Sequence, residues 1–182
     1  GWECPNLFLP DGAGPVNRPT FGRPDWFDYV GQECRAVRQR VGIVDLSPMA
    51  KYEVSGPATE KFLDRACANS LPREIGDVRV SQVLTPKGRI ACHMAVTRLA
   101  SDRFYLAAPA AAEVHHLDCL RHILPADGVS IDNITGRTGD LLLAGPRSRE
   151  VLAQLTDADL SDDAFPYSTA RDIRVGFAPV RA

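Results

Sequence analysis

The spacing of hydrophobic residues alternates between a helical and a strand-like period along the chain. Residues 26–40 place five apolar side chains at helical spacing, from Trp26 to Val37. Residues 78–99 hold two runs of alternating side chains around Pro86-Lys87-Gly88, and this arrangement predicts a β-hairpin. The same reasoning predicts helices at 26–40, 58–67 and 110–124, and further strands at 41–47, 49–56, 104–108 and 129–134.

The two ends of the chain lack a helical period. Residues 1–25 are rich in glycine, proline and asparagine. Because proline fixes φ and removes a donor, we expect an extended N-terminal segment there, anchored on a neighbour by Trp2, Phe8 and Phe21. Residues 173–182 alternate like a single strand. The sequence is expected to stop inside that strand, whose pairing partner is then missing.

One plan occurs twice: an apolar strand, a Gly-Pro pair and an amphipathic helix. The copies are YEVSGPATEKFLDRA and LLLAGPRSREVLAQL, and their glycines, Gly56 and Gly145, lie 89 residues apart (145 − 56). Glycine and proline suit a tight turn into a helix, so we expect a structural role for both pairs, with Pro57 at the first helical position. The repeat predicts an α+β fold of two related sheet-and-helix modules, at about 26–125 and 126–182.

Composition places the chain among ordinary globular domains. Of 182 residues 45% are hydrophobic and 24% are charged, and the formal net charge is −2 with both signs mixed. This balance gives no electrostatic reason to expect a nucleic-acid or membrane partner. The five cysteines include no CxxC pair. We expect reduced thiols in a cytoplasmic or mitochondrial-matrix protein rather than a disulfide framework.

Other catalytic motifs are weak. The sequence has no glycine-rich phosphate loop, so the chain alone is not expected to hold FAD or NAD through a dinucleotide-binding fold. A metal site can be drawn from His115, Asp118 and Cys119 at helical spacing, but a solvated polar face is the simpler interpretation, and no metal is expected. Asp45 and Ser47 are expected to bond the backbone of a turn rather than to form a serine nucleophile.

Several long stretches resemble one protein family. The run FGRPDWFDYVGQECRAVRQRVGIVDLSPMAKYEVSGPATEKFLDRACAN resembles the start of the folate-binding domain of glycine-cleavage T-proteins, the aminomethyltransferases. The opening GWECPNLF resembles the form of this domain in dimethylglycine and sarcosine dehydrogenase-like FAD-dependent oxidoreductases. The central GRIACHMAVTRLASDRFYL and the second Gly-Pro copy are similar to the same family. The resemblance implies a T-protein-type domain over 26–182 that is an N-terminal fragment, C-terminally incomplete because the family's GELGWE segment does not occur.

The resemblance implies tetrahydrofolate-dependent transfer of a one-carbon unit, aminomethyl or methyl. The carbon would come from an N-methyl amine such as dimethylglycine or sarcosine, oxidised by a flavoprotein module or subunit that carries the FAD. The alternative is a catalytically silent folate-binding or regulatory module, since regulatory relatives share the fold.

Five positions of the family's site can be located in this sequence by the resemblance. His93 stands where the family has an aspartate that steers the folate nitrogens and stabilises positive charge. Met49, in the DLS.M.K motif, and Tyr167 are expected to line the pterin pocket. Val80 stands where a tyrosine often supports the folate, and Pro109 falls near a folate-contacting asparagine.

The histidine alters the expected chemistry. An imidazole, with a reference pKa of ~6.5, is neutral or positive near neutral pH and cannot supply the fixed anion that favours a developing cation. Three interpretations of His93 remain open: a drifted position in a non-catalytic module, an altered acid or base, or a histidine outside the site. The sequence thus predicts an aminomethyltransferase-type enzyme with an altered catalytic position, with the silent module as the alternative.

Overall fold

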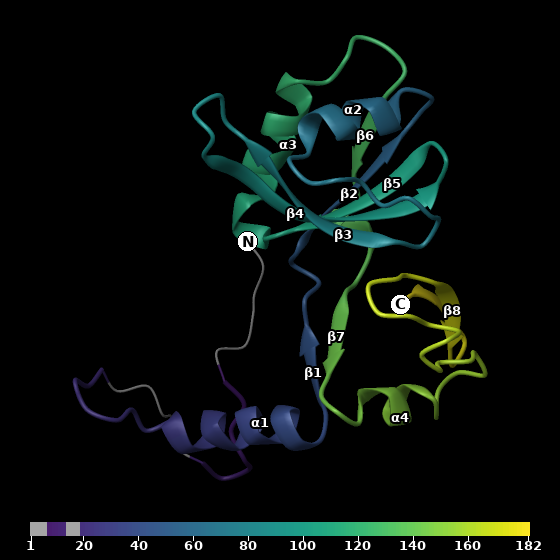
Figure 1. Cartoon of the computed structure of the whole chain (residues 1–182). Helices are drawn as coiled ribbons and strands as arrows, with labels where there is room; N and C mark the ends of the chain where they lie inside the picture. The colour runs from purple at the N-terminus through teal and green to yellow at the C-terminus, as the bar shows by residue number, and fades with distance from the viewer. Residues whose placement is uncertain (1–6, 14–18) are drawn as a thin grey trace. The chain divides into compact units, whose positions relative to one another are not determined.

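The computed structural model describes residues 7–13 and 19–182 and divides the chain into two compact units (Figure 1). The smaller unit comprises the residues up to Val44 together with Leu141–Gln154. The larger comprises Asp45–Asp140 and Leu155–Ala182. Each unit combines strands with helices, which confirms the predicted α+β class. The module boundary near residue 125 stays a prediction.

A five-stranded antiparallel sheet, in the order β3-β4-β5-β2-β6, organises the larger unit. Helix α2 (Thr59–Ala66) and helix α3 (Glu113–His122), which follows a short 3-10 turn, lie on one face of the sheet (Figure 1). The strands are β2 (Ala50–Ser55), β3 (Val78–Leu84), β4 (Ile90–Ala100), β5 (Arg103–Ala108) and β6 (Ser130–Asn133).

The hydrophobic core lies between these helices and the sheet. Successive strand side chains point to opposite faces, so every second residue of β2, β4 and β5 enters the core. The apolar side of α2 faces the core, since Phe62 is 6% and Leu63 0% exposed. Burying each such side chain stabilises the fold by roughly 1.5–3 kcal/mol. The other principal members are Tyr52, Val54, Met94, Val96, Phe104, Leu106, Leu117 and Leu120.

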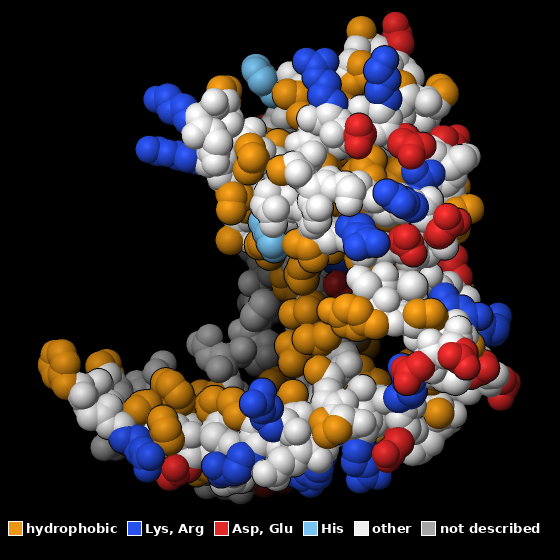
Figure 2. All heavy atoms as spheres, viewed as in Figure 1, with side chains coloured by type: hydrophobic (Ala, Val, Ile, Leu, Met, Phe, Trp, Pro, Cys, Tyr) orange, Lys and Arg blue, Asp and Glu red, His pale blue; other side chains and the backbone are white. Residues whose placement is uncertain are grey.

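The smaller unit contains helix α1 (Phe27–Gln39), strand β1 (Gly42–Asp45), strand β7 (Leu141–Ala144) and helix α4 (Ser148–Leu152). Strand β1, whose last residue falls in the larger unit, pairs with β7. No residue of α1 is fully buried, and Figure 2 shows hydrophobic side chains at the surface along this helix. Tyr29, Val30 and Val37 of its predicted apolar face are half-buried, whereas Cys34 is exposed.

The two Gly-Pro turns have the same geometry, which confirms their predicted structural role. Gly56 has φ +122° and Gly145 has φ +120°. A Cβ atom would come within 2.5 Å of the Gly128 carbonyl oxygen at the first turn and 2.6 Å of the Arg40 carbonyl oxygen at the second. Glycine is therefore required twice over, by the backbone angle and by the close approach. In both copies that same carbonyl accepts a 2.9 Å hydrogen bond from the amide two residues after the glycine.

The repeat extends beyond the turns. The series α1, β1, β2, α2 recurs about 89 residues later as α3, β6, β7, α4. Pairing crosses between the two series, because β2 of the first pairs with β6 of the second and β7 pairs with β1. Each unit is thus built from parts of both copies.

Two local expectations are wrong. Helix α2 begins at Thr59, so Pro57 precedes the helix instead of occupying its first position. The final segment is a two-stranded hairpin of β8 (Asp172–Val175) and β9 (Ala178–Arg181), so β8 has its partner. The reversal occurs at Gly176, whose φ of +57° suits a tight turn.

The N-terminal anchors differ from expectation as well. Phe8 is 68% exposed and Phe21 is fully exposed, so neither fixes this segment on a neighbour. Trp2 lies outside the described residues.

The Gly-Pro geometry predicts a large cost for adding one methyl group. Gly56→Ala should lower the free energy of unfolding by more than about 2 kcal/mol, because the positive φ and the Gly128 carbonyl both oppose a Cβ atom. Gly88→Ala is the matched control, since Gly88 has φ +73° and open space around it, and should cost only about 1 kcal/mol. Urea unfolding measures both, and equal costs would contradict the close-approach argument.

Candidate functional site

The sheet face opposite the core, which we call the outer face, carries most of the residues singled out in the sequence. Strand pairing places Val80, Ala95, Ala107 and Lys51 in one row across β3, β4, β5 and β2. His93 lies in the next row, paired with Gln82. Burial supports this assignment, because the neighbours of His93 in β4, Cys92 and Met94, are buried in the core.

Four of the five predicted site residues converge at one end of the outer face. The β4–β5 ladder ends at Ala95↔Ala107, two residues along β4 from His93 and two residues along the chain from Pro109. The β2–β5 ladder ends at Ala50↔Ala108, and Met49 and Pro109 are the next residues beyond that pair. Val80 is the diagonal neighbour of His93, a relation that typically separates residues by about 7–8 Å.

Tyr167 lies apart from this cluster. The loop that carries Tyr167 is held at the β3 edge of the sheet. The Val78 amide donates to the Ser168 carbonyl at 2.9 Å, and the Ser168 hydroxyl donates to the Val78 carbonyl at 2.9 Å. Ser168 has φ +63°, a left-handed conformation that is uncommon outside glycine. The Tyr167 side chain is 99% exposed. The structure therefore brings its backbone to the β3 edge but leaves the ring in solvent.

The surroundings of His93 are polar rather than anionic. Its Nδ1 lies 3.1 Å from Gln82 Nε2, so a neutral ring with its proton on Nε2 accepts the amide hydrogen bond. Burial first, and then the nearby imidazoles of His115 and His93, lower the pKa of His116.

Lys51 is a site residue that the sequence reasoning missed. Its side chain is 1% exposed, and its ammonium donates to the carbonyls of Ser47 at 2.7 Å and Met49 at 2.8 Å. These two bonds fix the turn before β2 and hence the position of Met49. The signal was present in the DLS.M.K motif, whose final residue is this lysine.

The turn itself satisfies its polar groups locally, as predicted for Asp45 and Ser47. The Ser47 amide donates to Asp45 Oδ1 at 2.8 Å, and the Asp140 amide donates to the Ser47 hydroxyl at 3.1 Å. Hydrogen bonds from the side chain and backbone of Ser47 hold the pKa of Asp45 below its usual value. These contacts explain the two residues as a structural turn.

Metal ligation gains no support from the helix histidines. His115 lies 3.6 Å from the Cys119 sulfur, but Asp118 is exposed. Among the described residues, no group of three or more histidine, cysteine or acidic side chains is arranged to hold a metal ion.

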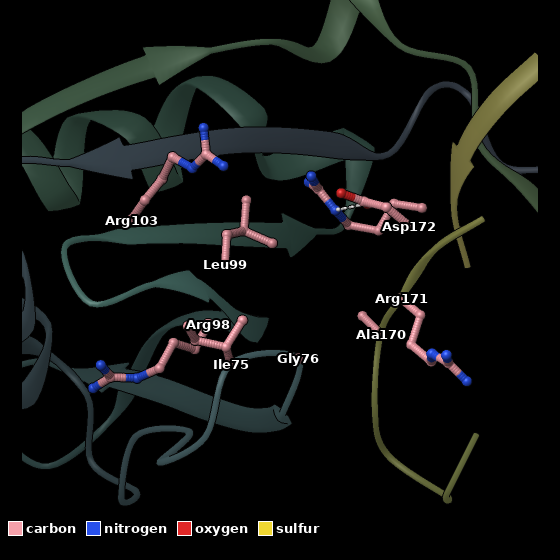
Figure 3. A pocket seen from close by; sticks show the side chains of 9 residues that line it. Ile75, Gly76, Arg98, Leu99, Arg103, Ala170, Arg171 and Asp172 are labelled. Carbon is pink, nitrogen blue, oxygen red and sulfur yellow. Dashed lines mark hydrogen bonds and ion pairs between the residues drawn. The ribbon is translucent and has the colours of Figure 1, made fainter. Parts of the chain in front are cut away.

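A pocket of about 280 Å³ lies elsewhere in the larger unit, where Ile75, Leu99 and several arginines meet the C-terminal hairpin (Figure 3). It adjoins the last residues of β4 and the first of β5, whereas His93 lies near the beginning of β4. At about 3.3 Å per residue, the six positions from His93 to Leu99 span roughly 20 Å of strand.

The arginines of this pocket already have partners. Arg98 donates to the Pro72 carbonyl at 3.0 Å and pairs with Glu60, and Arg181 pairs with Asp172 at 3.1 Å, the contact dashed in Figure 3. Arg171 donates to the carbonyl of Ala164, and Arg103 lies 3.9 Å from Glu53. We therefore interpret the pocket as a packing gap with a structural role, and we place the candidate site on the outer face.

The fold defines a class of protein. A solved glycine cleavage system aminomethyltransferase T from Bartonella henselae is similar over 76% of this chain and 37% of its own, with a TM-score of 0.68 and 26% identity. The architecture is therefore that of part of an aminomethyltransferase T-protein domain. The GCVT N-terminal domain model matches residues 1–182, and the chain belongs to that family.

Curated relatives extend this comparison. The mitochondrial dimethylglycine dehydrogenase of Rattus norvegicus is 38% identical over 184 residues, which cover 100% of this chain. The mitochondrial pyruvate dehydrogenase phosphatase regulatory subunit of Mus musculus is 29% identical over 184 residues and 98% of this chain. The chain spans 21% of the length of each of these relatives. No helix among the described residues has the length and apolarity to cross a membrane.

The Lys51 contacts predict that the turn before β2 depends on one buried cation. Lys51→Met should lower the free energy of unfolding by about 2 kcal/mol, because two carbonyls lose a charged donor. Amide exchange at Met49, whose N–H donates to Leu46 at 2.8 Å, should speed up more than exchange in the core strands. Lys61→Met, on the exposed side of α2, should change stability by less than about 0.5 kcal/mol. A Lys51 variant as stable as the Lys61 variant would contradict this role.

Proposed function

We propose that this chain forms the folate-facing part of a tetrahydrofolate-dependent one-carbon transfer domain. The observation that carries the proposal is the convergence of Met49, Val80, His93 and Pro109 at one end of the outer face. Membership of the GCVT N-terminal domain family supports the same ligand class.

The outer-face residues fit a flat, amide-rich ring such as a pterin. Val80 is 51% exposed and Met49 is half-buried, so both offer apolar surface to one side of a ring. Gln82 and His93 add a side-chain amide and an imidazole at the same end, and these groups pair with ring nitrogens and carbonyls. Lys51 contributes by fixing the backbone that carries Met49.

The outer-face residues fit folate binding better than they fit one-carbon transfer. Bound tetrahydrofolate supplies the nitrogens that accept the one-carbon unit. Positive charge develops on the transferred group, and a fixed anion nearby stabilises it most in a dry site. His93 offers only an imidazole, with Gln82 rather than a carboxylate as its hydrogen-bonding partner. We propose that His93 orients the ligand through hydrogen bonds of its ring and gives weak transfer.

The source of the carbon belongs to the same proposal. An N-methyl amine such as dimethylglycine or sarcosine, oxidised by an FAD-bearing module or subunit, supplies it. The relative with 38% identity, a mitochondrial dimethylglycine dehydrogenase, supports that substrate class and a mitochondrial setting.

A second candidate is a catalytically silent folate-binding or regulatory module. The specific observation that favours it is the imidazole at position 93 together with 29% identity to a phosphatase regulatory subunit. In this case the outer face binds folate, or a partner, without carbon transfer.

The two candidates predict different behaviour for His93→Asp. Both forms should bind tetrahydrofolate or 5-formyltetrahydrofolate in calorimetric titrations. One-carbon transfer, measured as methylenetetrahydrofolate formed with a flavoprotein that oxidises dimethylglycine, should rise about 10²–10³-fold in His93→Asp if the site is a weakened enzyme. No gain, with binding retained, favours the silent module.

The matched control is His122→Asp, which makes the same charge change on the exposed end of α3. It should leave both binding and transfer unchanged. Absence of binding by the parent chain and by His93→Asp at millimolar folate would overturn the folate proposal for this chain.

A further inference from the structure

A cluster of thiols lies where α3 packs on β4, on the core side of the sheet and away from the outer face. Cys92 belongs to β4 and is 0% exposed. Cys119 belongs to α3 and packs against the same core cluster while remaining partly exposed. Both are free thiols, as are the other described cysteines, Cys34 and Cys67.

His115 joins the helix to the strand at this point. Its Nε2 lies 3.2 Å from the carbonyl of Ala91, the residue before Cys92. It stands one helical turn before Cys119, whose sulfur is 3.6 Å from Nε2 and 4.0 Å from Nδ1. With Nε2–H donated to the Ala91 carbonyl, Nδ1 is left as an acceptor for the thiol proton. The thiol that solvent can reach therefore has a base beside it.

The two sulfurs also interact electrostatically. Burial first, and then the charge and hydrogen bond of Cys119, raise the pKa of Cys92 to about 12. Two thiolates side by side in a dry site are costly, so Cys92 stays protonated while Cys119, at the helix surface, is the site of first attack.

Cys67 does not compete for the same partner. It bridges to Val83, and Val83 pairs with Cys92, so two strand spacings separate Cys67 from Cys92. Two spacings amount to about 9.6 Å, beyond the roughly 7 Å limit for Cα atoms joined by a disulfide. Cys67 thus serves as a nearby, partly buried thiol that should remain free.

We infer that Cys119 and Cys92 form an oxidation-sensitive thiol pair, with Cys119 the reactive thiol, His115 its base and Cys92 the resolving thiol. The co-reactant is a hydroperoxide. The Cys119 thiolate attacks the outer oxygen, the O–O bond breaks, and Cys119 becomes a sulfenic acid while the peroxide leaves as an alcohol or water. The Cys92 sulfur then attacks the sulfenic sulfur, water leaves, and the S–S bond forms. The two thiols lose two electrons, and the hydroperoxide gains them.

Oxidation would tie α3 to β4 one residue from His93. The cross-link spans 27 residues (119 − 92), and it removes the freedom of α3 to separate from the strand. This modification site rests on the thiol geometry and does not require the proposed folate function.

The test exposes the 182-residue chain to hydrogen peroxide at a few equivalents and follows intact mass and peptide mapping after alkylation. The expected result is a loss of two hydrogens and one cross-linked peptide pair that contains Cys92 and Cys119. Cys119→Ser should abolish the cross-link, and His115→Gln should slow its formation about tenfold. Cys67→Ser, the matched control, should form the cross-link at the parent rate.

Cys92→Ala should trap Cys119 as a sulfenic acid, which dimedone labels. Because Cys92 is buried, far-ultraviolet circular dichroism must show that this variant is folded, and the parent peptide map gives the decisive result if it is not. Cross-links that join Cys67 or Cys34 instead, or oxidation of Cys119 with no intramolecular disulfide in the folded parent chain, would overturn the assignment.

Discussion

The burial of the beginning of β2 on both faces is the constraint on which the larger unit depends. On the core face Tyr52 is 0% exposed, and its hydroxyl donates to the Glu113 carbonyl at the start of α3 at 2.6 Å. On the outer face Lys51 is buried, and its ammonium holds the turn that leads into the strand. Its backbone amide also donates to the Thr135 hydroxyl at 2.9 Å. A strand buried on both sides must satisfy every polar group internally, and here those bonds fix three neighbouring segments at once.

Most secondary structure could be predicted from the sequence because the apolar periods are strong where the elements are long. Helix α1 and the β3–β4 hairpin follow directly from spacing and from the Pro86-Lys87-Gly88 turn. The C-terminal hairpin was missed because its two strands are four residues each and reverse at Gly176 without a break in alternation. The burial of Lys51 was also out of reach, since a lysine in an alternating strand ordinarily indicates the solvent-facing side. Pairing between distant strands, such as β2 with β6, has no local signal at all.

The candidate site, too, could be predicted from the sequence only in part. Resemblance to the family selected His93, Met49, Val80 and Pro109, but only strand register brings them to one end of the outer face. The sequence could not indicate that Tyr167 points to solvent, because that depends on how the loop joins the β3 edge at Ser168. Nor could spacing alone reveal that His115 lies beside Ala91, since the two residues belong to different elements and lie 24 positions apart (115 − 91).

The crossed pairing of the two copies has a consequence for where the chain can be divided. Strand β2 of the first copy pairs with β6 of the second, and β1 of the first pairs with β7 of the second. A cut between the copies, near residue 125, would therefore separate both of these strand pairs. The copies of the sequence repeat thus do not correspond to separable pieces of the structure.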